Sequence, residues 1–309
     1  MMVNACVPFS LMVPVAKQTF AQIVDGLPLS SVAYDTYDGC VFDANTLLVD
    51  AKLLRDYQAA PVGSTAEFTT QLVELVARAI HQIAVWFYKQ NTNRHKDDSL
   101  SRWRPSETYA PFYPATFHTT LFCHPWYRDY DQYPEGIGDC VGYWAEARIF
   151  GGVVLLDRRD PESTPDAEPD AIYLRPDRSG VIYRIYRLLD SQTEELSRFL
   201  LSDTTPPQHC PLPLLPSEAN RQRVDPEEDI EITGIHRDPW ERRPRQYGEP
   251  RFRDRRLKDV VDTFNYLSYE DWGAARGQKG TEKEERKAQK GKEAKLSPSH
   301  PTIFCLNKP

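Results

Sequence analysis

The sequence predicts an α+β fold in which helices pack on one face of an antiparallel sheet of four to five strands. Three observations predict it. A long stretch with helical hydrophobic spacing comes first, several short segments rich in β-branched and aromatic residues follow, and a second helical stretch comes after them. Helices and strands do not alternate along the chain, which argues against a doubly wound parallel sheet.

The first helix is predicted over residues 66–90. Apolar residues recur there every three or four positions and form one stripe, made of Leu72, Leu75, Val76, Ala79, Ile80, Ile83, Trp86 and Phe87. The opposite face is polar and carries Gln71, Glu74, Arg78 and Gln82. The second helix is predicted from Ser191 to about Leu201, because Ser191 and Glu194 form a capping-box pattern.

Strands are predicted between the two helices. Residues 116–123 have the β-branched and aromatic content of a strand. Residues 140–150 and 153–157 flank a Gly-Gly pair, which is typical of a hairpin turn because both glycines accept positive φ. Residues 171–175 and 181–188 form a second predicted hairpin.

Composition and charge divide the chain into four predicted parts. These are a globular α+β domain (1–204), a Pro-rich extended segment (205–235), an arm rich in Arg and aromatic residues with a short helix (236–273), and a disordered charged tail (274–309). Residues 1–235 carry 20 basic and 33 acidic side chains, and residues 236–309 carry 18 and 12. An acidic body with a basic arm predicts that the arm packs onto the domain.

The chain is expected to be an intracellular, cytoplasmic protein with reduced thiols. Its six cysteines are scattered and none forms a CxxC pair. The apolar first 16 residues lack a basic start and are interrupted by Pro8 and Pro14, so they are interpreted as a buried strand rather than a signal peptide. No run of about 18 uncharged apolar residues occurs, and no membrane contact is predicted.

Short motifs with a known mechanism are absent from the sequence. There is no P-loop, no GxGxxG after a strand, no GxSxG, no HExxH, no EF-hand loop and no kinase signature. Their absence argues against the common NTPases, dehydrogenases, serine hydrolases and zinc proteases, and no cofactor is predicted. An enzyme without a short signature stays open.

Candidate catalytic residues come from two of the predicted strands. Alternation along the strand over 140–150 places Glu146 on the same face as Trp144 and Arg148. If the preceding strand lies beside it, His118 or His124 approaches Glu146 and the two form an acid–base pair. Trp144 and Arg148 are then candidate contacts to a bound ligand.

A metal ion at the same place would take His118, His124 and either Asp139 or Cys140 as ligands. Their spacing matches no zinc template, so no metal site is predicted. Ordinary structural roles for these side chains are the simplest alternative, because clustered titratable groups are only probabilistic markers of a site.

Two aromatic-rich segments are candidate binding elements. In the loop 124–138 the aromatic side chains alternate with charges and are Trp126, Tyr127, Tyr130 and Tyr133. We expect them to face solvent and contact a ligand or partner, with a lid over one sheet edge as the structural alternative. In the arm, the candidates are Trp240, Arg242, Arg243 and Arg245. Such a segment suits nucleic acid, but the acidic body would repel the phosphates.

The segments FHTTLFCH, DCVGYWAEARIFGGVVLLDR and YRIYRLLDSQTEELSRFLL lie within Phe117–Leu201. They resemble a group of uncharacterised proteins from filamentous fungi. The resemblance implies no activity and no catalytic residue. Some of those proteins are encoded beside secondary-metabolite enzymes, so it implies an accessory role in such a pathway.

The leading hypothesis is a non-catalytic intracellular protein that binds a partner protein or a small apolar ligand through the loop and the arm. One alternative is an enzyme without a signature, acting on a small apolar metabolite through a His/Glu acid–base pair. A second alternative is nucleic-acid binding through the arm. Burial of all four loop aromatics in one core would remove the basis of the leading hypothesis.

Overall fold

The computed structural model describes most of the first 242 residues. The described ranges are 13–28, 47, 51–60, 66–90, 120–177, 184–202, 210–217, 219–224, 226, 229–242 and 273. The chain divides into two compact units, Met1–Val260 and Val261–Pro309, and every described residue except Gly273 belongs to the first. The short helix predicted in the arm, over residues 257–267, and the predicted disordered tail lie outside the described residues.

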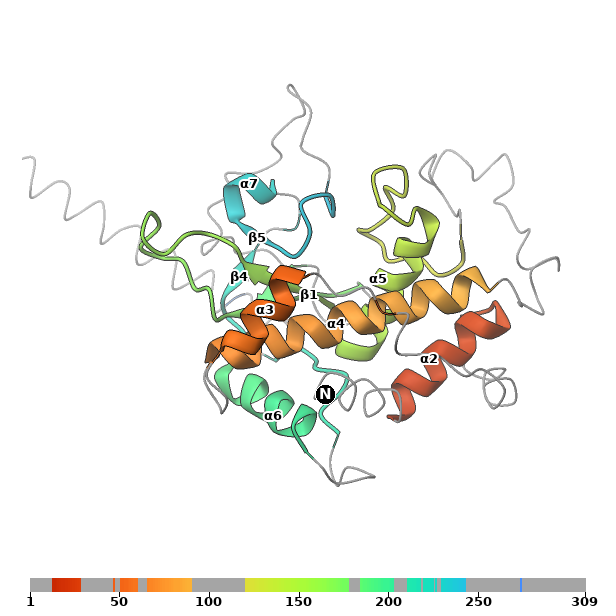
Figure 1. Cartoon of the computed structure of the whole chain (residues 1–309), viewed down its shortest axis with the longest axis horizontal. Helices are drawn as coiled ribbons and strands as arrows, with labels where there is room; N and C mark the ends of the chain where they lie inside the picture. The colour runs from red at the N-terminus through yellow and green to blue at the C-terminus, as the bar shows by residue number, and fades with distance from the viewer. Residues whose placement is uncertain are drawn as a thin grey trace, which may run out of the picture. The chain divides into compact units, whose positions relative to one another are not determined.

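The long helix predicted near the start of the chain is confirmed as α4 (Ala66–Lys89). Its contacts with other helices are to α2 at Pro14–Asp25, α3 at Ala51–Ala59, α5 at Ile137–Phe150 and α6 at Asp190–Leu200 (Figure 1). Phe20 of α2 packs on Phe87, with ring centroids 5.6 Å apart. Among the helices described, none combines the length and apolar character needed to cross a lipid bilayer.

At the N-terminus, residues 14–16 belong to α2, so the strand predicted there is wrong for these residues. Pro14 occupies the first turn of the helix, where its missing N–H would have no intrahelical partner in any case. The helix ends at Gly26, whose φ of 91° is a left-handed conformation that glycine adopts without strain.

The strand predicted at 140–150 is also wrong, because these residues form α5. Nearly every side chain of α5 is buried, so the sequence has no polar face that would reveal helical spacing. Gly151 takes a φ of 95° and its N–H donates to the carbonyl of Ala147 at 3.0 Å, which caps the helix. The Gly-Gly pair is therefore a helix cap rather than a hairpin turn. The described end of the preceding predicted strand, residues 120–123, has no strand structure either.

The sheet has five antiparallel strands in the order β4-β3-β2-β1-β5. Their bounds are Val153–Asp157 for β1, Ile172–Arg175 for β2, Ile185–Arg187 for β3, Arg223–Val224 for β4 and Ile235–His236 for β5. The first three strands lie within segments predicted to be strands. The two edge strands come from the Pro-rich segment and from its junction with the arm. The α+β class with an antiparallel sheet of four to five strands is confirmed.

The second predicted helix is confirmed as α6, although a different residue caps it. The backbone N–H of Leu189 donates to Oε1 of Gln192 at 3.0 Å, so Gln192 makes the reciprocal contact that was expected of Glu194. A single turn, α7 (Ile230–Thr233), ends at Gly234 with a φ of 64° and leads directly into β5.

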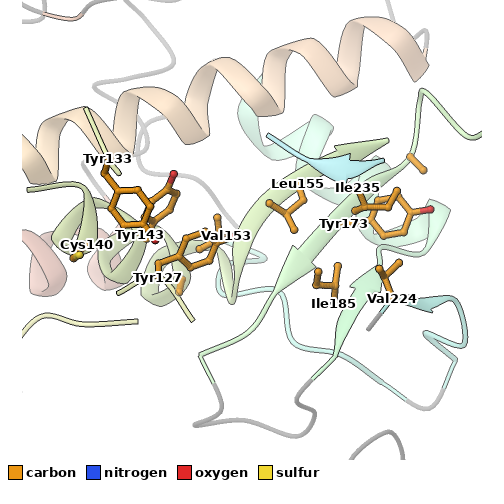
Figure 2. Close-up of a cluster of buried hydrophobic side chains, with 12 residues drawn as sticks. Tyr127, Tyr133, Cys140, Tyr143, Val153, Leu155, Tyr173, Ile185, Val224 and Ile235 are labelled. Atoms are coloured by element: carbon orange, nitrogen blue, oxygen red, sulfur yellow. The ribbon is translucent and has the colours of Figure 1, made fainter. Parts of the chain in front are cut away.

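A cluster of buried side chains joins α5 to the sheet (Figure 2). Its members are Tyr127, Tyr133, Cys140, Tyr143, Ala147, Val153, Leu155, Ala171, Tyr173, Ile185, Val224 and Ile235. Figure 2 shows three of its tyrosines gathered beside α5 and the aliphatic members spread over the sheet. The core therefore depends on residues from before α5 and from the last strand.

Candidate functional site

A cluster of charged side chains lies where α4 and α5 meet residues 235–242, and we call it the charged cluster. Its members are Glu74, Arg78 and His81 of α4, Asp139 and Glu146 of α5, Arg158 after β1, and Arg237 and Asp238 after β5. The members on α4 are four and three residues apart, so they share one side of that helix. The two on α5 are seven residues apart, about two turns, and also share a side.

His81 lies between two carboxylates. Its Nε2 is 2.9 Å from Oδ1 of Asp139, and its Nδ1 is 3.6 Å from Oε2 of Glu146. Burial lowers the pKa of His81, but the hydrogen bond to Asp139 and the nearby carboxylate of Glu146 outweigh burial and raise it above its ordinary value. The imidazole is thereby favoured in its charged form.

The His81 ring packs directly on the backbone of α5. Tyr143 meets it edge-on, with ring centroids 4.6 Å apart. A Cβ at Gly142 would lie 2.5 Å from Nε2 of His81, a separation at which one of the two groups has to move. Glycine at 142 is what lets the ring approach the helix closely enough to reach Asp139.

Glu146 is completely buried and is held by three hydrogen bonds. Its Oε1 accepts from the backbone N–H of Val154 at 2.6 Å and from Nη1 of Arg237 at 2.7 Å, and its Oε2 accepts from the same Nη1 at 2.8 Å. Burial lowers the pKa of Arg237, but Glu146 and Asp238 outweigh burial and raise it well above the ordinary value. This buried pair fixes β5 and the residues after it against α5.

The outer part of the charged cluster is a chain of ion pairs. Nη1 of Arg78 donates to Oδ1 of Asp238 at 2.9 Å, and Nη2 donates to Oε1 of Glu74 at 3.0 Å. Arg158 donates to the same Glu74 oxygen at 2.6 Å. Burial raises the pKa of Asp238, but Arg237 and Arg78 outweigh it, so the net shift is downward. Asp238 is therefore held in its charged form.

A cavity of about 280 Å³ opens beside the charged cluster. Its apolar and aromatic wall consists of Leu47, Val85, Trp86, Pro134, Tyr143 and Trp240. Its polar wall consists of Arg78, His81, Gln82, Lys89, Glu135, Asp139, Arg237 and Asp238. This combination of aromatic side chains with a few fixed polar groups is typical of small-molecule sites.

A second cavity, of about 740 Å³, lies between the start of α4, α6 and the turn before β2. Its acidic side chains, such as Glu168 and Asp190, are half-buried or exposed. Both cavities open to the surface, and only the smaller one is lined by fully buried titratable groups. We take the smaller cavity as the candidate site because such groups concentrate at functional sites.

The predicted acid–base pair is not assembled between His124 and Glu146. His118 lies outside the described residues. His124 is buried, and its Nε2 is 3.3 Å from the carbonyl oxygen of Arg175, whereas Glu146 is occupied by Arg237. Burial, and then the charge of Arg175, lower the pKa of His124 well below its ordinary value. The histidine that meets Glu146 is His81, which was not among the predicted site residues.

The aromatic loop divides between core and surface. Tyr127 and Tyr133 are buried, Trp126 is partly buried, and Tyr130 is exposed. The expectation that all four face solvent is therefore wrong for Tyr127 and Tyr133. The guanidinium of Arg175 lies 5.1 Å from the ring centroid of Tyr127 and 5.3 Å from that of Trp126, so these rings hold a buried cation.

The other predicted binding residues lie in different environments. Trp144 is buried against Phe122, and the guanidinium of Arg148 lies 5.6 Å from its ring centroid. Of the arm, Trp240 lines the cavity, whereas Arg242 is buried and pairs with Glu241 at 3.3 Å. Arg243 and Arg245 lie outside the described residues.

Within the described ranges, no group of three or more His, Cys, Asp or Glu side chains is placed to hold a metal ion. Comparison with known proteins gives no match, whether to a protein-family model, to a curated protein or to a solved structure. The geometry of the charged cluster and its cavity is therefore the basis for a functional proposal.

Proposed function

We propose that this protein binds a small, largely apolar ligand in the 280 Å³ cavity beside the charged cluster, without transforming it. The observation that carries the proposal is the pairing of an aromatic wall with a polar wall whose charged side chains are held in ion pairs. Aromatic side chains supply contact area, and a fixed polar wall holds the shape of the cavity before the ligand arrives.

The contacts of the polar wall favour binding over catalysis. Asp139 uses one oxygen for His81 and the other for the backbone N–H of Glu135, at 2.7 Å. Arg237 and Asp238 are likewise engaged with each other and with the rest of the charged cluster. Groups held in this way shape a site and exclude water.

A cytoplasmic location is part of the proposal. The three described cysteines, Cys123, Cys140 and Cys210, are all free thiols. Free thiols persist in reducing compartments, whereas oxidising compartments favour disulfides.

Removing the exposed indole of Trp240 tests the proposal. Trp240 and Tyr130 are 39% and 37% exposed, but only Trp240 lines the cavity, so Tyr130→Ala is a matched control. The full chain is titrated by calorimetry with neutral and charged aromatic and aliphatic fragments. We expect Trp240→Ala to weaken the tightest fragment by about tenfold and Tyr130→Ala to leave it unchanged. Absence of any saturable binding, or equal losses in both variants, would contradict the proposal.

Acid–base catalysis is a second candidate, favoured by the contact between His81 and Asp139 on the cavity wall. An imidazole with a raised pKa is a donor of protons to a bound molecule near neutral pH. The test is incubation of the full chain with a metabolite extract, followed by mass spectrometry. A conversion that His81→Gln abolishes supports catalysis, and a conversion that the variant retains contradicts a role for His81.

A further inference from the structure

We infer that the ligand is an uncharged, planar aromatic molecule of about bicyclic size, with one polar group that hydrogen-bonds the hydroxyl of Tyr143. This inference rests on the proposed binding function and names the class of ligand. Size, charge and an unused hydroxyl on the cavity wall lead to it independently.

The volume and shape of the cavity set the size of the ligand. An apolar cavity of about 150 Å³ accommodates benzene. The cavity here has about 280 Å³, close to twice that volume, so two fused rings fill it. Trp86 of α4 and Trp240 after β5 both line it, and indole faces favour flat, stacked partners.

Charge on the ligand is disfavoured because every titratable side chain of the wall already has an opposite partner. Arg78 pairs with Asp238, His81 with Asp139, Lys89 with Glu135, and Arg237 with Glu146. With His81 protonated, the charged cluster contains four carboxylates and four cations and is neutral. An ionised ligand would add a charge without a partner next to this balanced set, which is costly away from water.

The hydroxyl of Tyr143 is an unused polar group of the wall. Tyr143 is 1% exposed and lines the cavity, and its ring is fixed by His81, Tyr127 and Arg237. Among the residues that the structure describes, none forms a hydrogen bond with this hydroxyl. A ligand that fills the cavity takes this hydroxyl out of water, which is unfavourable without a partner, so a ligand that supplies an acceptor or donor there gains affinity.

Three related probes and two variants test the inference. Naphthalene, 2-naphthol and 2-naphthoate share the bicyclic frame and differ in their polar group. Tyr143→Phe removes the hydroxyl from the cavity wall. Tyr133→Phe is the control, because it also removes a buried tyrosine hydroxyl but Tyr133 does not line the cavity. The hydroxyl of Tyr133 donates to the carbonyl of Glu241 at 3.5 Å.

We expect 2-naphthol to bind the full chain at least about fivefold more tightly than naphthalene, and 2-naphthoate to bind least. Tyr143→Phe should reduce the affinity for 2-naphthol to that for naphthalene, and Tyr133→Phe should leave the order unchanged. Tightest binding by 2-naphthoate would overturn the charge argument, and an equal effect of Tyr143→Phe on all probes would overturn the role of the hydroxyl.

The two proposals fail in different ways. In the first case no naphthyl probe binds, but a charged or aliphatic fragment binds and Trp240→Ala weakens its binding. The inference about the ligand class is then wrong, and the proposed binding site is retained. If no fragment of any class binds, both are wrong.

Discussion

Substituting Gly142 by Ala should destabilise the protein, although this change in a helix normally stabilises. Alanine in a helix interior gains about 1 kcal/mol over glycine. Here the added Cβ would lie 2.5 to 2.6 Å from three atoms of the His81 ring. Over-packing of this kind costs about 1–3 kcal/mol. Displacing the ring also weakens its charge-assisted hydrogen bond to Asp139, which contributes about 1.5–3 kcal/mol.

Together, the gain in helix propensity, the over-packing and the weakened hydrogen bond predict that Gly142→Ala lowers the free energy of unfolding by about 2 kcal/mol and the Tm by about 4–8 °C. In a His81→Ala background the ring is absent, so the same Gly142→Ala change should stabilise by about 1 kcal/mol. The assay is urea unfolding of the four proteins of this double-mutant cycle, followed by circular dichroism. A coupling energy near 3 kcal/mol is expected. Equal effects of Gly142→Ala in both backgrounds would refute the close packing of His81 on α5.

Three further predictions concern buried ionisable groups. Arg237→Met should lower the free energy of unfolding by about 3–5 kcal/mol, because it leaves the buried carboxylate of Glu146 without its arginine partner. Adding Glu146→Gln should recover part of this loss, as measured by urea unfolding. Arg175→Met should lower the free energy of unfolding by less than about 1 kcal/mol, since Arg175 has no carboxylate partner among the described residues. A loss as large as that of Arg237→Met would contradict this. Stability is measured between pH 5 and 8.5. The raised pKa of His81 predicts a stabilisation that is complete below pH 6.5 and is lost as the pH rises. The lowered pKa of His124 predicts a stabilisation that is lost as the pH falls below 6.5. His81→Gln should flatten the alkaline limb of the stability profile and His124→Gln the acid limb, and an unchanged limb would contradict the corresponding assignment.

The elements that the sequence predicted well have one polar and one apolar side, or lie between clear turns. Helix α4 has an apolar stripe opposite a polar face, and strands β1 to β3 are apolar runs bounded by polar or glycine-containing segments. Helix α5 was missed because burial on all sides removes the helical period, and the aromatic residues in it favoured a strand. Strands β4 and β5 have two residues each, which is too short for any periodicity.

The candidate site was only partly predictable. Glu146 was predicted as one half of an acid–base pair, and its observed partners come from α4 and from residue 237, which lie 65 and 91 positions away in the chain. A signal for His81 does exist in the sequence. Together with Glu74 and Arg78 it forms a row of ionisable side chains at four- and three-residue spacing along the polar side of the helix, which is the spacing of residues that can meet one partner element. The partners across the fold follow only from the topology.

The position of Arg237 near the end of the described body has a consequence for how the chain folds during synthesis. Glu146 enters the interior with α5, yet its counter-ion and the strand that completes the sheet edge beside β1 are translated about 90 residues later. Until residue 237 has left the ribosome, Glu146 lacks its arginine partner and the edge of the sheet beside β1 is unpaired. We therefore expect this body to close only after nearly all of it has been made.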